Sequence, residues 1–171
     1  MLKNGIKDPV SALTHFIGLL ACIPCIFALI FQASHQDAMT QVIGFAIFGL
    51  SLVLLYGAST IYHTLYVSEA KTILLRRIDH IMIFVLIAGT YTPICLVSLA
   101  GPWGWTMLAL IWILAIGGAV MKIFWIQAPR WLSTSLYIIM GWLAVIAFVP
   151  LQRAVSWDCL LYTSDAADDL I

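Results

Sequence analysis

Long apolar runs alternate with short polar stretches along most of the chain. Five runs, covering residues 12–31, 42–62, 78–99, 103–121 and 131–150, approach the ~20 mostly apolar residues with which a helix crosses a bilayer. They are too long for strands, and apolar and polar residues do not alternate within them. A helix also satisfies its own backbone hydrogen bonds in lipid. The pattern therefore predicts an all-α fold, a polytopic transmembrane helix bundle.

The composition excludes the main soluble classes. Apolar residues make up 63% of the 171 positions and charged residues 9%, and the mean hydropathy is +1.05. A soluble domain is roughly 45–50% apolar and about 25% charged. Eight Lys and Arg are balanced by eight Asp and Glu, so no basic field is present to attract nucleic acid. Membrane lipids are the partners that this composition predicts.

The basic residues predict how the bundle is oriented. Seven of the eight precede the first run or lie between the second and third or the fourth and fifth runs, and only Arg153 falls on the other side. The seven are Lys3, Lys7, Lys71, Arg76, Arg77, Lys122 and Arg130. Basic loops are retained in the cytoplasm. The sequence thus predicts a multi-pass protein of the cell inner membrane with a cytoplasmic N-terminus.

The end of the sequence has a different character. Residues 156–171 contain four of the eight acidic residues, so residues 1–155 alone carry eight basic and four acidic residues, a net charge of +4. One interpretation is a short, solvated acidic tail. The other is a non-native tail, because the stretch CLLYTSDAADD resembles a translated sequencing-library adapter. On that interpretation residues 1–155 form the transmembrane domain, and the tail is left out of the fold prediction.

Three polar residues near predicted helix ends are candidates for a site. Ser59 and His63 are four residues apart, so both face the same side of the second helix. Asp79 lies at the start of the third run, and consecutive antiparallel helices would bring it to the same depth. Ionisable groups inside a membrane indicate function unless they are paired. Imidazole is a zinc ligand, and a carboxylate or hydroxyl can orient a ligand or a metal-bound water.

Each of these residues also has a structural interpretation. His63 can extend to the membrane interface. Asp79 can cap the third helix, where the helix dipole favours a carboxylate, or can pair with Arg76 or Arg77. Ser59 can serve as a small residue at a helix contact. Spacing alone leaves both interpretations open, because one His does not make a zinc site.

The same residues resemble a known family. Ser59-x-x-x-His63, followed by the run from Asp79 to Pro93, is similar to the haemolysin III family, the bacterial branch of the progestin and adipoQ receptor superfamily. Residues 14–18 resemble that family's entry into helix 1, and residues 137–143 resemble its helix 5. The resemblance covers roughly residues 8–155. It implies a seven-helix bundle, of which five helices are present here.

The resemblance also implies a zinc site near the cytoplasmic face. His63 would be a metal ligand, Asp79 would hold a zinc-bound water, and Ser59 would support Asp79. Two further His ligands would come from an H-x-x-x-H pair in helix 7, which the printed sequence does not contain. The first functional hypothesis is a zinc-dependent hydrolase of lipid amides or esters. The alternatives are a non-enzymatic regulator of membrane lipid state with structural zinc, and a pore-forming haemolysin.

Overall fold

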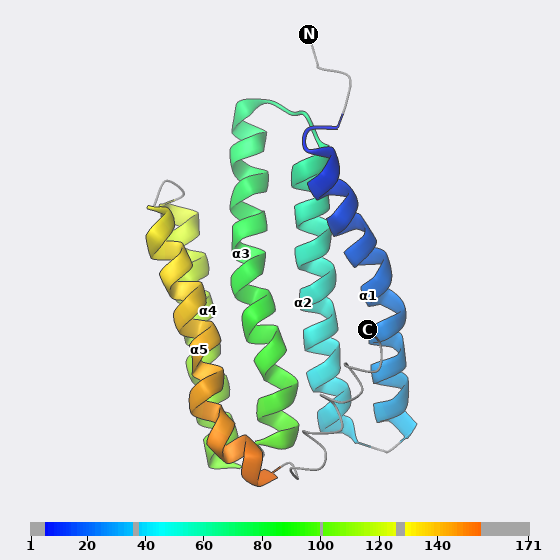
Figure 1. Cartoon of the computed structure of the whole chain (residues 1–171), viewed down its shortest axis with the longest axis vertical. Coiled ribbons are helices and arrows are strands. Elements are labelled where there is room, and N and C mark those ends of the chain that lie inside the picture. Colours follow the sequence, from blue (N-terminus) through cyan, green and yellow to red (C-terminus); the bar gives the residue numbers. More distant parts are fainter. Residues whose placement is uncertain (1–5, 36–37, 100, 126–128, 155–171) are drawn as a thin grey trace, which may run out of the picture.

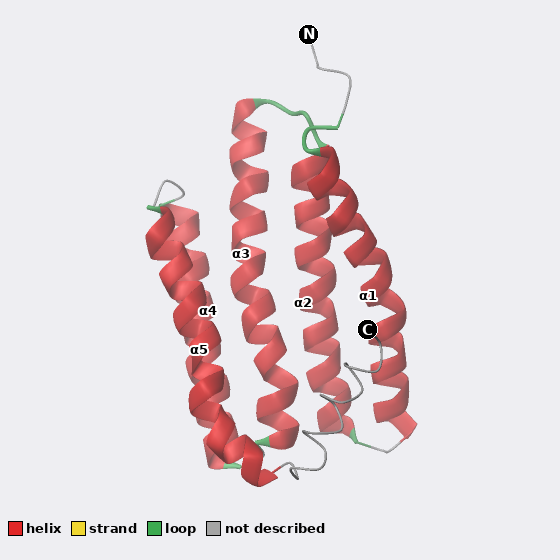
Figure 2. Ribbon diagram, in the orientation of Figure 1, coloured by secondary structure: helices red, strands yellow, loops and turns green. Residues whose placement is uncertain are grey.

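Helices make up almost all of the described protein (Figure 1). The computed structural model describes residues 6–35, 38–99, 101–125 and 129–154. Figure 2 shows helices and loops but no strand in this part of the chain. The elements are α1 (Pro9–His35), α2 (Met39–Thr64), α3 (Glu69–Pro93), η1 (Ile94–Ser98), α4 (Pro102–Phe124) and α5 (Arg130–Ala154). The predicted all-helical fold class is confirmed.

The helices pack in chain order. α1, α2 and α3 stand side by side, and α4 and α5 lie beyond α3 (Figure 1). The short connections make consecutive helices antiparallel, so α1, α3 and α5 all begin at the same end of the bundle. We call this end the basic end. The residues that define it are Lys7, Lys71, Arg76, Arg77 and Lys122.

The surface of the helices is apolar, as a bilayer requires. α1, α2, α4 and the combined segment Glu69–Ser98 are each long and apolar enough to cross a membrane. The described part of α5 contributes a shorter apolar helix, Trp131–Ala147. Large apolar side chains point outward along these helices, and Phe27, Ile113 and Trp142 are each at least 65% exposed. Such exposure in water would be unfavourable, but hydrocarbon chains solvate these side chains well.

The core lies where α3, α4 and α5 meet. Phe84, Ile111 and Met140 are fully buried there. The hydroxyl of Tyr91 on α3 donates to the backbone carbonyl of Met140 on α5, with an oxygen–oxygen distance of 2.7 Å. Gly118 of α4 lies directly against the Phe84 ring. Small residues allow membrane helices to approach closely, and this packing fixes the position of α3 relative to α4.

The C-terminal end of α3 passes from α-helical to π-helical hydrogen bonding. The α-helix ends at Pro93 and continues without a break as the π-helical segment η1. Pro93 has no N–H to donate to the preceding turn, and the wider turn closes when the Leu99 N–H donates to the Ile94 carbonyl at 2.9 Å. A proline inside a helix ordinarily kinks or breaks it. The structure instead shows that the chain stays helical with a changed hydrogen-bond pattern.

Candidate functional site

The residues before α1 are bonded to the last turn of α2. The Asp8 N–H donates to the His63 carbonyl at 2.9 Å, and the Lys7 N–H donates to the Thr64 carbonyl at 3.3 Å. These two bonds satisfy carbonyls that a helix leaves without intrahelical partners at its C-terminus. They hold the N-terminal segment against the basic end of α2.

Side chains extend this contact. Oδ2 of Asp8 lies 3.0 Å from Nδ1 of His63, and the His63 and Asp8 side chains are 21% and 46% exposed. The Lys7 ammonium is 3.9 Å from the same carboxylate oxygen and 3.6 Å from the centre of the Tyr62 ring. His63 therefore does not simply extend into the interface. It belongs to a network of four side chains that joins the N-terminal segment to α2.

A second histidine covers the His63 ring. His15 of α1 stacks on His63 with a centroid distance of 5.6 Å and an interplanar angle of 13°. The Tyr56 ring lies on the other side of this contact, 6.0 Å from His15. Sequence spacing gives no hint of the pair, because His15 and His63 lie in different helices.

Ser59 and Asp79 are both buried. Ser59 is 3% exposed, one turn before His63 on α2, and Asp79 is 9% exposed on α3. Because α3 begins at Glu69, Asp79 lies well inside the helix, and its interpretation as a helix cap is wrong. A helix dipole acts within the first turn only. In the described residues the ion pairs involve Asp8, and none involves Asp79.

Asp79 has neighbours on the side of α3 that packs against α5. It directly precedes His80, whose backbone carbonyl faces α5. The Tyr137 hydroxyl donates to the His80 carbonyl at 3.2 Å, and its ring lies 4.6 Å from that of Phe84. Asp79 thus sits beside a contact between α3 and α5.

The described contacts of His63 and the surroundings of Asp79 involve different helices. His63 contacts the N-terminal segment and α1, and Asp79 directly precedes His80, whose carbonyl accepts a hydrogen bond from Tyr137 of α5. No hydrogen bond joins Ser59, His63 and Asp79 to one another within the described ranges. Over the same ranges, no three His, Cys, Asp or Glu side chains lie close enough to hold a metal ion. Convergence of the three on one metal stays a prediction.

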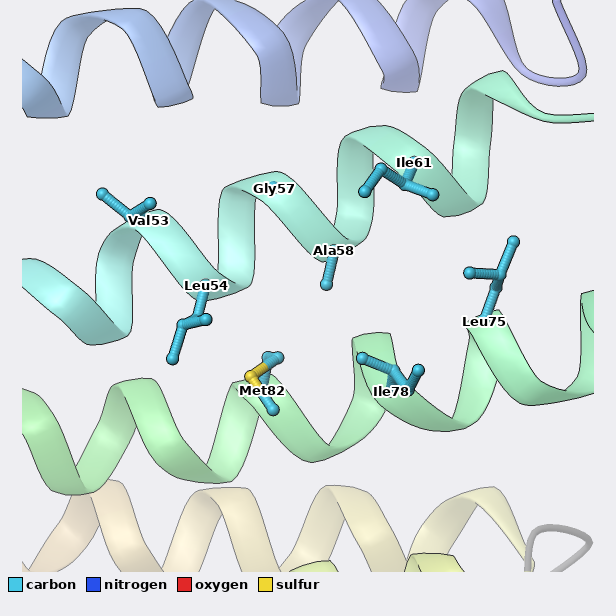
Figure 3. A pocket seen from close by; sticks show the side chains of 8 residues that line it. All are labelled: Val53, Leu54, Gly57, Ala58, Ile61, Leu75, Ile78 and Met82. Atoms are coloured by element: carbon cyan, nitrogen blue, oxygen red, sulfur yellow. The ribbon is translucent and has the colours of Figure 1, made fainter.

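An apolar pocket lies between α2 and α3, at about the depth of Ser59 and Asp79 in the bundle (Figure 3). Its volume is about 340 Å³. Gly57 and Ala58 provide short side chains within the α2 wall, and none of the three predicted site residues lines the pocket. The lining consists of Val53, Leu54, Gly57, Ala58, Ile61, Leu75, Ile78 and Met82.

The pocket and the buried polar residues lie on the same turns of α2 and α3. Ala58 and Ile78 line the pocket, and each directly precedes a predicted site residue, Ser59 or Asp79. Successive residues of an α-helix are about 100° apart around its axis. The Ser59 side chain is therefore turned away from the pocket, whereas Asp79 lies at its edge, four residues after Leu75 and three before Met82, which both line it.

Comparison with known proteins identifies the family. The family described as "Haemolysin-III related" matches residues 4–164. The chain is a member of the haemolysin III family. "Hemolysin-3" of Bacillus cereus is 44% identical over 153 residues, which are 89% of this chain and 69% of that protein. "Hemolysin-3 homolog" of Bacillus subtilis (strain 168) is 45% identical over 152 residues, 88% of this chain and 71% of the relative.

Family membership and the apolar helices together make this a multi-pass membrane protein. The resemblance seen in the sequence is confirmed at the level of the family. The sequence analysis missed Asp8, which lies 55 residues before its partner His63. Its one local signal is the Asp8-Pro9 pair, which marks a helix start but does not predict a contact with another helix.

Proposed function

We propose that this haemolysin III family protein lies in the bacterial inner membrane with its basic end in the cytoplasm, and that His63 contributes to a zinc site at that end. Three arguments support the orientation and the site. Basic residues gather at one end of the bundle, which favours its retention in the cytoplasm. His63 lies at that end, and the Asp8 carboxylate is within hydrogen-bond distance of one of its two ring nitrogens, Nδ1.

The His63–Asp8 pair is the observation that carries the proposal. Metal-bound histidines commonly donate the N–H of the non-coordinating nitrogen to a carboxylate. With Nδ1 directed at Asp8, Nε2 of His63 is the nitrogen left to coordinate a metal. The chemistry of this side chain fits one zinc ligand. The described residues do not supply a complete ligand set, and the family resemblance assigns two further His ligands to a helix outside the printed sequence.

The reaction that we propose is hydrolysis of an amide or ester bond in a membrane lipid. When bound, zinc lowers the pKa of its water and polarises a carbonyl. Asp79 would hold and orient the attacking water and accept its proton, and Ser59 would orient Asp79. Both side chains are buried in the bundle, where a carboxylate and a hydroxyl are retained at a cost that indicates function.

A second function is favoured by the pocket. A cavity of about 340 Å³ lined by apolar side chains suits part of a lipid acyl chain, and neither Ser59 nor Asp79 is among the residues that line it. A protein that binds lipid there without cleaving it would regulate membrane lipid state, with zinc in a structural role. The two functions differ in whether Asp79 is needed for lipid turnover.

Zinc content and lipid turnover test both parts of the proposal. Protein purified together with the helix that supplies the H-x-x-x-H pair should carry zinc, its His63→Ala variant should lose it, and His35→Ala should keep it, because His35 lies at the opposite end of α1. Asp79→Ala should abolish hydrolysis of vesicle lipids and retain the metal. Zinc in His63→Ala at the wild-type level would refute the site.

The functional alternatives give different results with the same protein. Lipid turnover that is unchanged in Asp79→Ala would refute the hydrolase. Bound zinc without turnover, together with altered membrane order in a deletion strain, would support the regulatory function instead. Leakage of dye from vesicles containing the wild-type protein would support pore formation, which is one way to lyse cells as the name of the relative "Hemolysin-3" describes.

A further inference from the structure

The carboxylate of Asp8 has an unusual hydrogen-bond partner for its position in the chain. The Asp8 carbonyl accepts the Ala12 N–H at 2.9 Å, which makes Asp8 the N-cap of α1, and Pro9 is the first helical residue. An Asp at an N-cap ordinarily accepts a hydrogen bond from an N–H of its own first turn. Here the carboxylate lies instead within hydrogen-bond distance of the His63 ring in another helix.

The backbone fixes this carboxylate relative to the ring. Asp8 donates its N–H to the carbonyl of His63, the same residue whose side chain its carboxylate contacts. Its own carbonyl is held by the first turn of α1. The backbone N–H and carbonyl of Asp8 are thus both bonded to helices, so the backbone from which its side chain reaches the His63 ring is fixed.

Two neighbours restrict the His63 ring further. The stacked His15 ring limits its tilt, and the Lys7 ammonium lies next to the Asp8 carboxylate and over the Tyr62 ring. These contacts come from α1 and from the N-terminal segment that precedes it. The ring is therefore enclosed on the Nδ1 side and on one face, which a purely interfacial histidine does not require.

An ionised carboxylate can only accept hydrogen bonds. Nδ1 of neutral His63 must then carry the proton, and Nε2 must carry the lone pair. We propose that Asp8 is a positioning residue that fixes His63 in the Nδ1–H tautomer and so leaves the lone pair on Nε2, the nitrogen that would coordinate a metal. This inference rests on the proposed role of His63 as a zinc ligand. A purely structural Asp8 would affect stability but not the tautomer.

The tautomer is measurable without any metal. Histidine ¹⁵N chemical shifts of the full chain in lipid nanodiscs, recorded in alkaline buffer, distinguish a protonated ring nitrogen from an unprotonated one. The His63 signals are assigned by their loss in His63→Ala. We expect a protonated Nδ1 in the wild type, a shift toward the Nε2–H form in Asp8→Ala, and restoration in Asp8→Glu.

Val10→Ala is the matched control, because Val10 lies two residues after Asp8, is 77% exposed and leaves the carboxylate and its contacts in place. It should keep the wild-type tautomer. A wild-type spectrum with a protonated Nε2 would overturn the inference, and this outcome needs no variant. An unchanged tautomer in folded Asp8→Ala, with its helix content verified by far-UV circular dichroism, would overturn it as well.

Zinc affinity separates this inference from the proposed function. In competition with a chromophoric chelator, Asp8→Ala should bind Zn²⁺ about 10- to 100-fold more weakly than wild type, the usual effect of losing such a partner. Equal affinity of wild type and His63→Ala would refute the metal site, while the tautomer would still test Asp8. Loss of affinity in His63→Ala but not in Asp8→Ala would refute the role of Asp8 alone.

Discussion

Replacing Gly118 with Ala tests whether α3 and α4 pack as closely as the structure shows. A Cβ at this position would lie 2.5 Å from Cζ and 2.6 Å from Cδ1 of Phe84. Carbon atoms attract best at about 3.5–4.0 Å, so the ring or the helix must move by roughly 1 Å. Phe84 is fully buried and is flanked by the Tyr137 ring at 4.6 Å. Gly118→Ala should therefore be destabilising.

The adjacent glycine provides a matched control. A Cβ on Gly117 would have no other atom within 4 Å. Both substitutions gain the same helix propensity, about 1 kcal/mol for Ala over Gly, so this gain cancels in the comparison. The remaining difference is the cost of overpacking a closed core, typically about 1–3 kcal/mol. We expect Gly118→Ala to have a lower free energy of unfolding than Gly117→Ala by that amount.

The assay is equilibrium unfolding in mixed micelles, followed by far-UV circular dichroism as the fraction of SDS rises. A double variant with Phe84→Leu should recover part of the loss in Gly118→Ala, because a smaller side chain makes room for the new methyl group. Unfolding free energies of Gly117→Ala and Gly118→Ala that agree within about 0.5 kcal/mol would refute the close contact.

Three further substitutions test helix contacts away from the basic end by the same assay. Tyr91→Phe removes the donor to the Met140 and Gly141 carbonyls, at 2.7 and 3.0 Å, and should cost about 0.5–1.5 kcal/mol; an unchanged stability would contradict these bonds. Gly104→Ala places a Cβ against backbone carbonyls of the π-helical segment and its end. It should destabilise by more than Gly118→Ala does, whereas Gly141→Ala, inside α5 with open space around it, should be stabilising by up to about 1 kcal/mol.

The helices and the family could be predicted from sequence because both depend on local information. A bilayer requires about 20 apolar residues in every spanning helix, so the runs alone predict five helices. The helix ends were less predictable. α3 begins at Glu69 and not at residue 78, because polar residues at the membrane surface continue the helix without contributing to hydropathy. This earlier start is what places Asp79 inside the helix.

The candidate site was predictable only in part. Ser59, His63 and Asp79 stand out as polar residues near apolar runs, and the structure places Ser59 and Asp79 in buried positions. Their convergence on a metal stays a prediction. The partner of His63 could not be predicted, because Asp8 lies 55 residues away and only the packing of α1 on α2 brings the two together.

The sequence by itself determined that this is a helical membrane protein of the haemolysin III family. Length, hydropathy and short motifs are properties of neighbouring residues, and the solvent acts on each helix separately. The tertiary structure decided which side chains meet. Gly117 and Gly118 are equivalent in the sequence, but only Gly118 faces Phe84. The Asp8 carboxylate at the N-cap of α1 contacts His63 of α2 for the same reason, because contacts between helices depend on how their faces pack.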